Sequence, residues 1–220
     1  MEENPPPRIV NFYIDGFNFY FGLKRMVQHK PDWKKFYWID FVKLCSGFLD
    51  QGEVLGTVTY FTARPKGQSK VKKQNSLLYA NKAVNPENFK AMYGRYAKKD
   101  LLCKANPGCN QYYEDYEEKE TDVNLAIQMV VDAYEKTCNR MVLISGDTDF
   151  APPLKIIKEK HRDIKTMVLF PAGKQSQQLS SLCHVNKGLE RQKPKWNRAV
   201  MPEEFEVNGR SYRIPDDWKV

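Results

Sequence analysis

Short apolar segments alternate along this chain with longer stretches in which apolar residues recur every three or four positions. The short segments are nearly continuous, which is typical of strands that are covered on both faces. They predict four strands, at Ile9–Ile14, Glu53–Ala63, Met141–Ile144 and Lys165–Phe170. The periodic stretches predict six helices, at about Gly16–Leu23, Ile39–Leu49, Gln68–Val84, Thr121–Lys136, Phe150–Lys160 and Ser176–Val185.

The order of these elements predicts the class of fold. Helices separate most of the successive strands, and a connection between parallel strands needs about a dozen residues or more, which a helix supplies. Strands joined in this way form a parallel sheet with helices on both faces. We therefore predict an α/β fold of three layers, in which a parallel central sheet lies between two layers of helices.

Two segments carry more specific signals. Thr121 is a favoured capping residue, and the helix that begins there is predicted to bury one apolar stripe. That stripe consists of Val123, Ala126, Ile127, Val130 and Tyr134. Helical periodicity is lost over residues 89–118, which we interpret as an irregular insertion with at most one short strand.

The chain is long enough to bury one full core. We predict a flexible tail at 1–8, one domain at 9–190 and a C-terminal extension at 191–220. In the extension, Asn208-Gly209 lies between two short segments and predicts a β-hairpin. The hairpin either packs on the domain or forms an oligomer contact, so a homo-oligomer is one expected assembly.

Composition narrows the setting of the protein. The net charge of +8 favours polyanionic partners, because neutralised phosphates release condensed counterions. No apolar run reaches the roughly 18 residues of a membrane span, and the polar, proline-rich N-terminus is unlike a signal peptide. We therefore expect a cytoplasmic or nucleocytoplasmic protein with no membrane partner.

The five cysteines are odd in number and lie mostly among apolar neighbours. That pattern is more typical of reduced thiols than of a disulfide framework. Cys103 and Cys109 flank a Pro-Gly turn, but a zinc knuckle there needs two further ligands, which the nearby sequence lacks. We interpret the two as loop thiols without a metal.

Aspartates follow two of the predicted strands, at the edge where parallel sheets build ligand sites. Asp15 follows the first strand, and Asp147 and Asp149 follow the third. Asp122 lies in the first turn of a helix and can point toward the same edge. Each has an alternative role, since Asp149 can cap the next helix, Asp122 can complement a helix dipole and Asp15 can serve in a turn.

Carboxylates that lie close together repel one another, and the repulsion raises some of their pKa values. A hard divalent cation removes this repulsion, and Mg²⁺ and Mn²⁺ prefer oxygen ligands. Four acids with retained waters suit one or two such ions and a phosphodiester. The predicted metal ligands are Asp15, Asp122, Asp147 and Asp149.

Three sequence blocks around these aspartates resemble the signature blocks of NYN domains, a group within the PIN-like superfamily. The blocks are Ile14-Asp15-Gly16-Phe17-Asn18, Glu118-Lys119-Glu120-Thr121-Asp122-Val123 and Ser145-Gly146-Asp147-Thr148-Asp149-Phe150. They occur in the expected order and spacing, and the resemblance covers about residues 8–190. The chain is most similar to the LabA-like and NicB-like bacterial branch.

The resemblance implies a PIN-like Rossmannoid fold and RNA cleavage that depends on Mg²⁺ or Mn²⁺, with a metal-activated water as the attacking group. It implies that the four aspartates surround the metal and that Asn18 assists by hydrogen bonding. Ser145 and Thr148 are expected to support the ligands through their hydroxyls. Some relatives carry a further acid where Gln128 stands here, so one metal is a safer expectation than two unless Asp132 substitutes.

Basic residues cluster after the second strand, with tyrosines interleaved. Cations combined with stacking aromatics hold single-stranded nucleic acid without reading its sequence. We therefore expect Arg64, Lys70 and Lys73 to contact single-stranded RNA, although any one lysine can simply belong to a solvated helix face.

Two other functions stay open. The first is a nucleic-acid-binding regulatory module that keeps the acidic site and cleaves nothing. The second is a small-molecule enzyme, because one NicB-like relative is linked to hydroxylation of a pyridine compound, and fold does not determine the reaction. The sequence has no Gly-x-Gly-x-x-Gly fingerprint that would support a dinucleotide cofactor.

Overall fold

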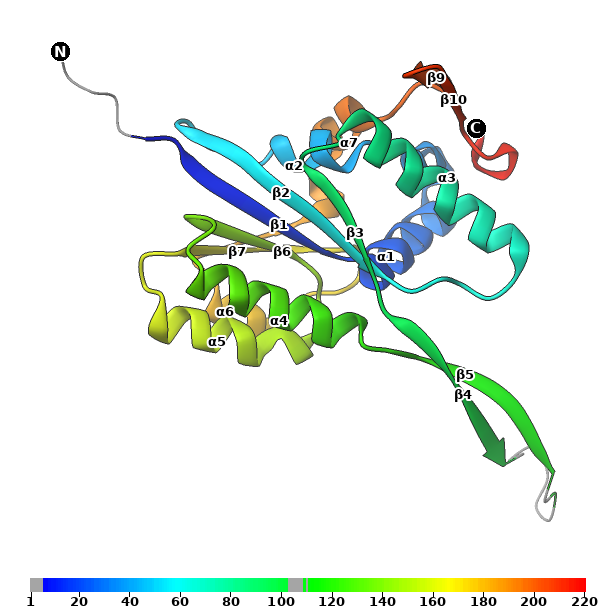
Figure 1. The fold of residues 1–220 in the computed structure, drawn as a ribbon, viewed down its shortest axis with the longest axis horizontal. Coiled ribbons are helices and arrows are strands. Elements are labelled where there is room, and N and C mark those ends of the chain that lie inside the picture. Colours follow the sequence, from blue (N-terminus) through cyan, green and yellow to red (C-terminus); the bar gives the residue numbers. More distant parts are fainter. Residues whose placement is uncertain (1–5, 103–108, 110) are drawn as a thin grey trace.

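Six parallel strands form the central sheet of the protein (Figure 1). The computed structural model describes residues 6–102, 109 and 111–220, with the backbone alone at 115–117. Across the sheet the strands follow the order β3–β2–β1–β6–β7–β8, and each neighbouring pair is parallel. Their bounds are β1 (Arg8–Asp15), β2 (Glu53–Thr62), β3 (Phe89–Tyr93), β6 (Arg140–Ile144), β7 (Lys165–Phe170) and β8 (Val185–Gly188). The predicted α/β class is confirmed.

Helices cover both faces of the sheet (Figure 1). One face packs against α1 (Gly16–His29), α2 (Phe41–Ser46), α3 (Gln68–Val84) and α7 (Lys193–Ala199). The other packs against α4 (Thr121–Tyr134), α5 (Ala151–Lys160) and α6 (Gln177–Leu182). Short 3₁₀ helices occur at Pro31–Tyr37, Thr148–Phe150, Leu189–Arg191 and Asp216–Trp218. Within the described residues, no helix is long and apolar enough to cross a membrane.

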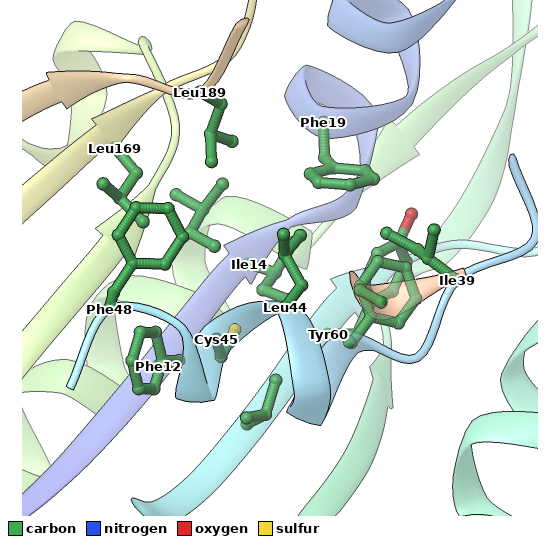
Figure 2. Close-up of a cluster of buried hydrophobic side chains, with 14 of the residues drawn as sticks. Phe12, Ile14, Phe19, Ile39, Leu44, Cys45, Phe48, Tyr60, Leu169 and Leu189 are labelled. Atoms are coloured by element: carbon green, nitrogen blue, oxygen red, sulfur yellow. The ribbon is translucent and has the colours of Figure 1, made fainter. Parts of the chain in front are cut away.

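Alternate residues of the buried strands divide between the two layers. On β1, Phe12 and Ile14 belong to the core shared with α1 and α2, whereas Tyr13 belongs to the core shared with α4. Figure 2 shows the first core, where Phe19 of α1 and Leu44 of α2 approach the sheet. The nearly continuous apolar runs in the sequence therefore reflect burial on both faces.

The described residues of the segment at 89–118 lie mostly in three strands, so the prediction of an irregular insertion is wrong for them. β3 extends the central sheet beside β2, and β4 (Arg95–Leu102) pairs antiparallel with β5 (Tyr112–Lys119). The β4–β5 pair projects away from the sheet (Figure 1). An ion pair between Lys98 and Glu114 links its strands, and neither side chain is buried. An exposed pair of this kind has no apolar periodicity, and so the sequence pattern misses it.

The edge strand β8 is also absent from the predicted elements. The helix predicted at Ser176–Val185 ends at Leu182 as α6, and β8 begins three residues later. β8 is short and exposed, and it carries the polar residues Asn186 and Lys187. Its composition therefore does not mark it as a strand, and only pairing with β7 defines it.

Helix α4 buries a different stripe from the predicted one. The apolar side chains that it buries are Leu125, Met129 and Ala133. In the predicted stripe, Val123 is 58% exposed, Ile127 is 56% exposed and Tyr134 is 60% exposed. Both sets recur at helical spacing, so periodicity alone cannot choose between them. The choice follows from the way in which the helix docks on the sheet.

The C-terminal extension packs on the domain. β9 (Glu204–Val207) and β10 (Arg210–Arg213) pair antiparallel across Asn208-Gly209. Trp38 is almost fully buried beneath this segment, and its indole Nε1 donates a hydrogen bond to the carbonyl oxygen of Pro202 at 2.7 Å. A small apolar cluster continues the contact, and its buried members are Trp38, Ala80, Met201 and Ile214.

The two stripes of α4 predict opposite sensitivities to truncation. Met129→Ala removes a fully buried side chain and is expected to lower the free energy of unfolding by about 2–5 kcal/mol. Ile127→Ala removes a largely exposed side chain and is expected to change it by less than about 1 kcal/mol. Equilibrium urea denaturation followed by tryptophan fluorescence measures both values. Equal losses would contradict this packing of α4.

Candidate metal centre

Neighbouring parallel strands bring the first two site residues together. Ile14 of β1 and Ile144 of β6 are partners in register, so Asp15 and Ser145 follow side by side at the carboxyl edge of the sheet. The hydroxyl of Ser145 donates a hydrogen bond to Asp15 Oδ2 at 2.7 Å. Both side chains are almost fully buried. Ser145 therefore contacts Asp15 directly, and the support of a metal ligand by its hydroxyl stays a prediction.

Asp15 also caps helix α1. Its Oδ1 accepts the backbone N–H of Asn18 at 3.0 Å, and its Oδ2 accepts the side-chain amide of Asn18 at 2.6 Å. The turn role and the site role proposed for Asp15 are thus compatible. Gly16 permits the close approach of this turn to β2, because a Cβ there would lie 2.6 Å from the carbonyl oxygen of Phe61. Asn18 Oδ1 is buried and has no hydrogen-bond partner among the described residues.

The loop after β6 carries the next two acids. Ser145 Oγ accepts the backbone N–H of Asp147 at 3.0 Å, and Asp147 Oδ1 accepts the backbone N–H of Asp149 at 3.1 Å. Asp147 is therefore the N-cap of the 3₁₀ turn at 148–150, whereas the alternative role given above to Asp149 was to cap the next helix. Thr148 and Asp149 are exposed at this edge. One serine thus orients both the acid after β1 and the acid after β6.

Asp122 reaches the centre from the first turn of α4. The helix is not capped by Thr121, because Thr121 is its first helical residue and its Oγ1 lacks a hydrogen-bond partner among the described residues. Instead Glu118 Oε1 accepts the backbone N–H of Thr121 at 2.9 Å. The predicted site omits Glu118, although its carboxylate raises the pKa of Asp122. A capping box would place its acid at the third residue of the helix, whereas Glu118 lies before the helix, so that pattern does not mark it.

The pKa shifts indicate that the negative charges of these acids act on one another. Burial, followed by the negative charges of neighbouring acids, raises the pKa of Asp122 to about 6; those acids are Asp15, Glu118, Asp147 and Asp149. Burial also raises the pKa of Asp15, and Asp147 adds to that rise, whereas hydrogen bonds from Asn18 and Ser145 oppose it. Both shifts mean that the ionised centre is unfavourable in the absence of a compensating cation.

The acids are neighbours, but they are not gathered as a finished ligand set. Among the residues that the structure describes, no group of three or more His, Cys, Asp or Glu side chains is arranged to hold a metal ion. Repelling carboxylates favour separated positions, and the oxygens of Asp15 already accept hydrogen bonds from Asn18 and Ser145. The donor chemistry nevertheless fits a hard cation, because it consists of carboxylates and one unpaired amide oxygen.

Asp132 does not substitute for the further acid found in some relatives. Its Oδ2 accepts a hydrogen bond from the hydroxyl of Tyr13 at 2.6 Å, and its Oδ1 accepts one from Gln128 Nε2 at 2.9 Å. Asn11 Nδ2 lies 3.5 Å from the same carboxylate. Asp132 is therefore held in a buried polar network below the edge of the sheet.

The three predicted substrate contacts have different surroundings. Arg64 is exposed just past the end of β2, and its guanidinium carbon lies 5.8 Å from the centre of the Tyr93 ring. Lys70 is exposed on the first turn of α3. Lys73 forms an ion pair with Asp217 of the C-terminal extension, so part of its charge is already matched. Arg64 and Lys70 are thus the stronger candidates.

The described cysteines contribute nothing to this centre. Cys45, Cys109, Cys138 and Cys183 are free thiols, and burial raises the pKa of Cys45 well above its usual value. Cys103 lies outside the described residues. The interpretation of Cys103 and Cys109 as a thiol pair without a metal therefore stays a prediction.

A parallel sheet with acids where its two central strands end is the architecture of an α/β protein of the PIN-like type. The chain belongs to the NYN domain family, whose profile matches residues 10–186. A solved structure of a protein of unknown function from Vibrio parahaemolyticus has the same fold, with a TM-score of 0.56 and 14% identity over 85% of this chain and 96% of that one.

A curated relative carries an enzyme name. It is the 6-hydroxy-3-succinoylpyridine 3-monooxygenase HspA of Pseudomonas putida, which is 26% identical over 200 residues. The match covers 77% of this chain and 62% of that relative, so the chain spans less than two thirds of its length.

The raised pKa of Asp122 predicts a stability difference that depends on pH. The folded state disfavours the ionised carboxylate of Asp122. Its destabilising contribution to the free energy of unfolding is therefore absent below the unfolded pKa of 3.8 and grows as pH rises through the folded pKa of about 6. In the presence of a chelator, Asp122→Asn is therefore expected to unfold at higher urea than the wild type at pH 8. After allowance for partial exposure, the gain is about 1–2 kcal/mol.

The gain should shrink toward pH 4, and Mn²⁺ should stabilise the wild type more than the variant. Asp32→Asn is a matched control, because Asp32 forms an ion pair with Lys193 and its pKa is lowered. That control should show no gain at pH 8. A pH-independent gain for Asp122→Asn would contradict repulsion as its cause.

Proposed function

We propose that this protein is a metal-dependent ribonuclease that hydrolyses phosphodiester bonds of single-stranded RNA. The observation that carries the proposal is the group of neighbouring acids at the carboxyl edge of the sheet, where Asp15 and Asp122 both have raised pKa values. Membership of a nuclease-like family supports the choice of a phosphodiester substrate. Excess positive charge supports a polyanionic partner.

Four aspartates would hold Mg²⁺ or Mn²⁺ in this proposal, and they are Asp15, Asp122, Asp147 and Asp149. When bound, the ion would lower the pKa of a coordinated water and offset negative charge on the phosphate. The unpaired Oδ1 of Asn18 is available to accept a hydrogen bond from a water at the same place. Glu118 adds a further carboxylate beside Asp122 and is a candidate base for that water.

The surrounding residues would orient the acids and the substrate. Ser145 holds Asp15 through its hydroxyl proton and Asp147 through its lone pair. Thr148 offers an exposed hydroxyl at the same edge. Arg64 and Lys70 would neutralise phosphates, and the exposed Tyr93 would stack on a base. Lys73 would contribute less, because Asp217 already pairs with it.

Cleavage of single-stranded RNA with Mn²⁺ or Mg²⁺ tests the proposal directly. Asp147→Asn keeps the shape of the side chain and removes a ligand charge, so the rate should fall by at least about 100-fold. Asp163→Asn is a matched control, because Asp163 is exposed just before β7 begins, at the edge of the sheet opposite the acids. This variant should cleave normally. Gel electrophoresis of an end-labelled oligonucleotide measures both rates.

Nuclease activity would be rejected if cleavage by the wild type did not exceed the Asp147→Asn background with either metal. An equal loss in Asp147→Asn and Asp163→Asn would point to a general effect of charge and would reject a specific role for Asp147. RNA binding without cleavage would instead support the regulatory module.

Ser145→Ala tests whether one hydroxyl organises the centre. The variant loses both contacts between the β1 and β6 acids, so metal affinity and cleavage should each fall by about 10–100-fold. Ser46→Ala, an exposed serine on α2, is the matched control and should change neither. Calorimetric titration with Mn²⁺ measures affinity separately from turnover. Unchanged affinity in Ser145→Ala would remove Ser145 from the proposed site.

A second candidate function rests on the curated relative. Its name describes a monooxygenase that acts on 6-hydroxy-3-succinoylpyridine. Oxygenation of such a ring by this chain would require dioxygen and a reduced cofactor as co-reactants. Mass spectrometry of the pyridine incubated with protein, dioxygen and a reduced flavin or nicotinamide would detect the gain of one oxygen atom. No gain, combined with metal-dependent RNA cleavage, would reject this candidate.

A further inference from the structure

A polar groove lies beyond the ends of the last two strands of the sheet. It has a volume of about 580 Å³ and is formed by the end of β7, the start of α6, β8 and the turn that follows β8. β7 and β8 are parallel neighbours, so the groove opens at the same carboxyl edge as the acids. We call it the β7–β8 groove.

One loop connects the groove with the acidic centre. Residues 171–175 follow β7, and Gln175 at the end of this loop lines the groove. At its other side the loop packs on the β6 loop, since a Cβ on Gly146 would lie 2.6 Å from Lys174 Cβ. Arg25 of α1 anchors the loop with two hydrogen bonds to the carbonyl oxygen of Ala172, at 3.1 and 2.7 Å. A ligand in the groove is therefore separated from the acids by one fastened loop.

The lining of the groove is mostly polar, and its charges have one sign. Its charged residues, Lys187 and Arg191, are both cations, and no acid lines the groove within the described part of the chain. Four carboxamides accompany them, from Gln175, Gln177, Asn186 and Gln192. Glu190 lies nearby and forms an ion pair with Arg191, with 3.9 Å between its carboxylate and Arg191 Nε. Part of the charge of Arg191 is therefore matched, whereas Lys187 forms no ion pair within the described residues.

Such a lining suits an anionic ligand with many hydrogen-bonding groups. Most small-molecule pockets are predominantly apolar, and this groove is not. Lysine and arginine neutralise phosphates, and carboxamides can both donate to and accept from the edges of unpaired bases. The volume lies within the usual range for binding pockets, about 300–1,000 Å³.

We propose that the β7–β8 groove holds single-stranded RNA on one side of the acidic centre. The inference rests on the proposed ribonuclease function and names the path of its substrate. Along the carboxyl edge, Arg64 follows β2 and Tyr93 ends β3. The acids lie where β1 and β6 end, and the groove lies where β7 and β8 end. Parallel strands lie about 4.8 Å apart, so the path from β2 to β8 is roughly 20 Å long with the acids near its middle.

Binding of a fluorescently labelled single-stranded RNA, measured by anisotropy in EDTA, tests this path without requiring cleavage. The double variant Lys187→Ala/Arg191→Ala should bind about tenfold more weakly and show a shallower dependence on salt, because it loses two phosphate contacts. The matched control is Lys160→Ala/Arg162→Ala, which removes two exposed cations at the opposite end of α5 and should bind normally.

A second variant leaves the cations in place. Asn186→Asp preserves the size of the side chain and places a negative charge in the groove, so it should weaken RNA binding by about tenfold. Asn208→Asp makes the same change in the exposed C-terminal turn and should have no effect. Unchanged thermal unfolding of both variants ensures that the comparison reports on binding.

The outcomes separate the path from the function. If the groove variants bind as tightly as their controls while the wild type cleaves RNA, the path is wrong and the ribonuclease function stands. If the wild type binds no RNA, both proposals fail. If 6-hydroxy-3-succinoylpyridine binds the wild type and is lost in Asn186→Asp while RNA binding is unchanged, the groove holds a small anionic heterocycle and the RNA path is overturned.

Discussion

The parallel pairing of β1 with β6 determines where the acids of this protein meet. Because the register places Ile14 opposite Ile144, Asp15 and Ser145 leave the sheet together, and the serine hydroxyl can donate to one acid while it accepts from the backbone of Asp147. Helix α1 starts from the same aspartate. Contacts among Asp15, Ser145 and Asp147 therefore link the strand pairing, the start of α1 and the positions of two carboxylates.

This arrangement places charge where folding alone would avoid it. Asp15 is buried, and the pKa of Asp122 is raised by burial and by the negative charges of four other acids. A centre of this kind reduces stability when it is ionised and empty, and such sites are common where a protein binds ligands or performs catalysis. By contrast, the buried Asp132 has its oxygens bonded to Tyr13 and Gln128 and needs no ligand.

Family membership and chemistry are separate questions for this chain. The NYN profile covers most of it, yet the curated relative carries the name of a monooxygenase. Fold does not determine reaction, so the residues on either side of the acidic centre are what distinguish a nuclease from a small-molecule enzyme. On one flank an exposed arginine lies over a tyrosine, and on the other a groove is lined by carboxamides and cations. Both flanks carry cations, and the proposed path of an extended anion depends on them.

The sequence by itself determined the fold class, because continuous apolar runs mark strands buried on both faces. It also placed Asp15, Asp147 and Asp149 just where strands end, while the metal site of four aspartates stays a prediction. Three features depended on tertiary structure. Helix α4 carries two apolar stripes, and docking selected Leu125 and Met129 over Val123 and Ile127. Strands β4, β5 and β8 are exposed, so pairing defines them and periodicity does not. The β7–β8 groove forms only when distant segments meet, since short-range patterns contain no information about such neighbours.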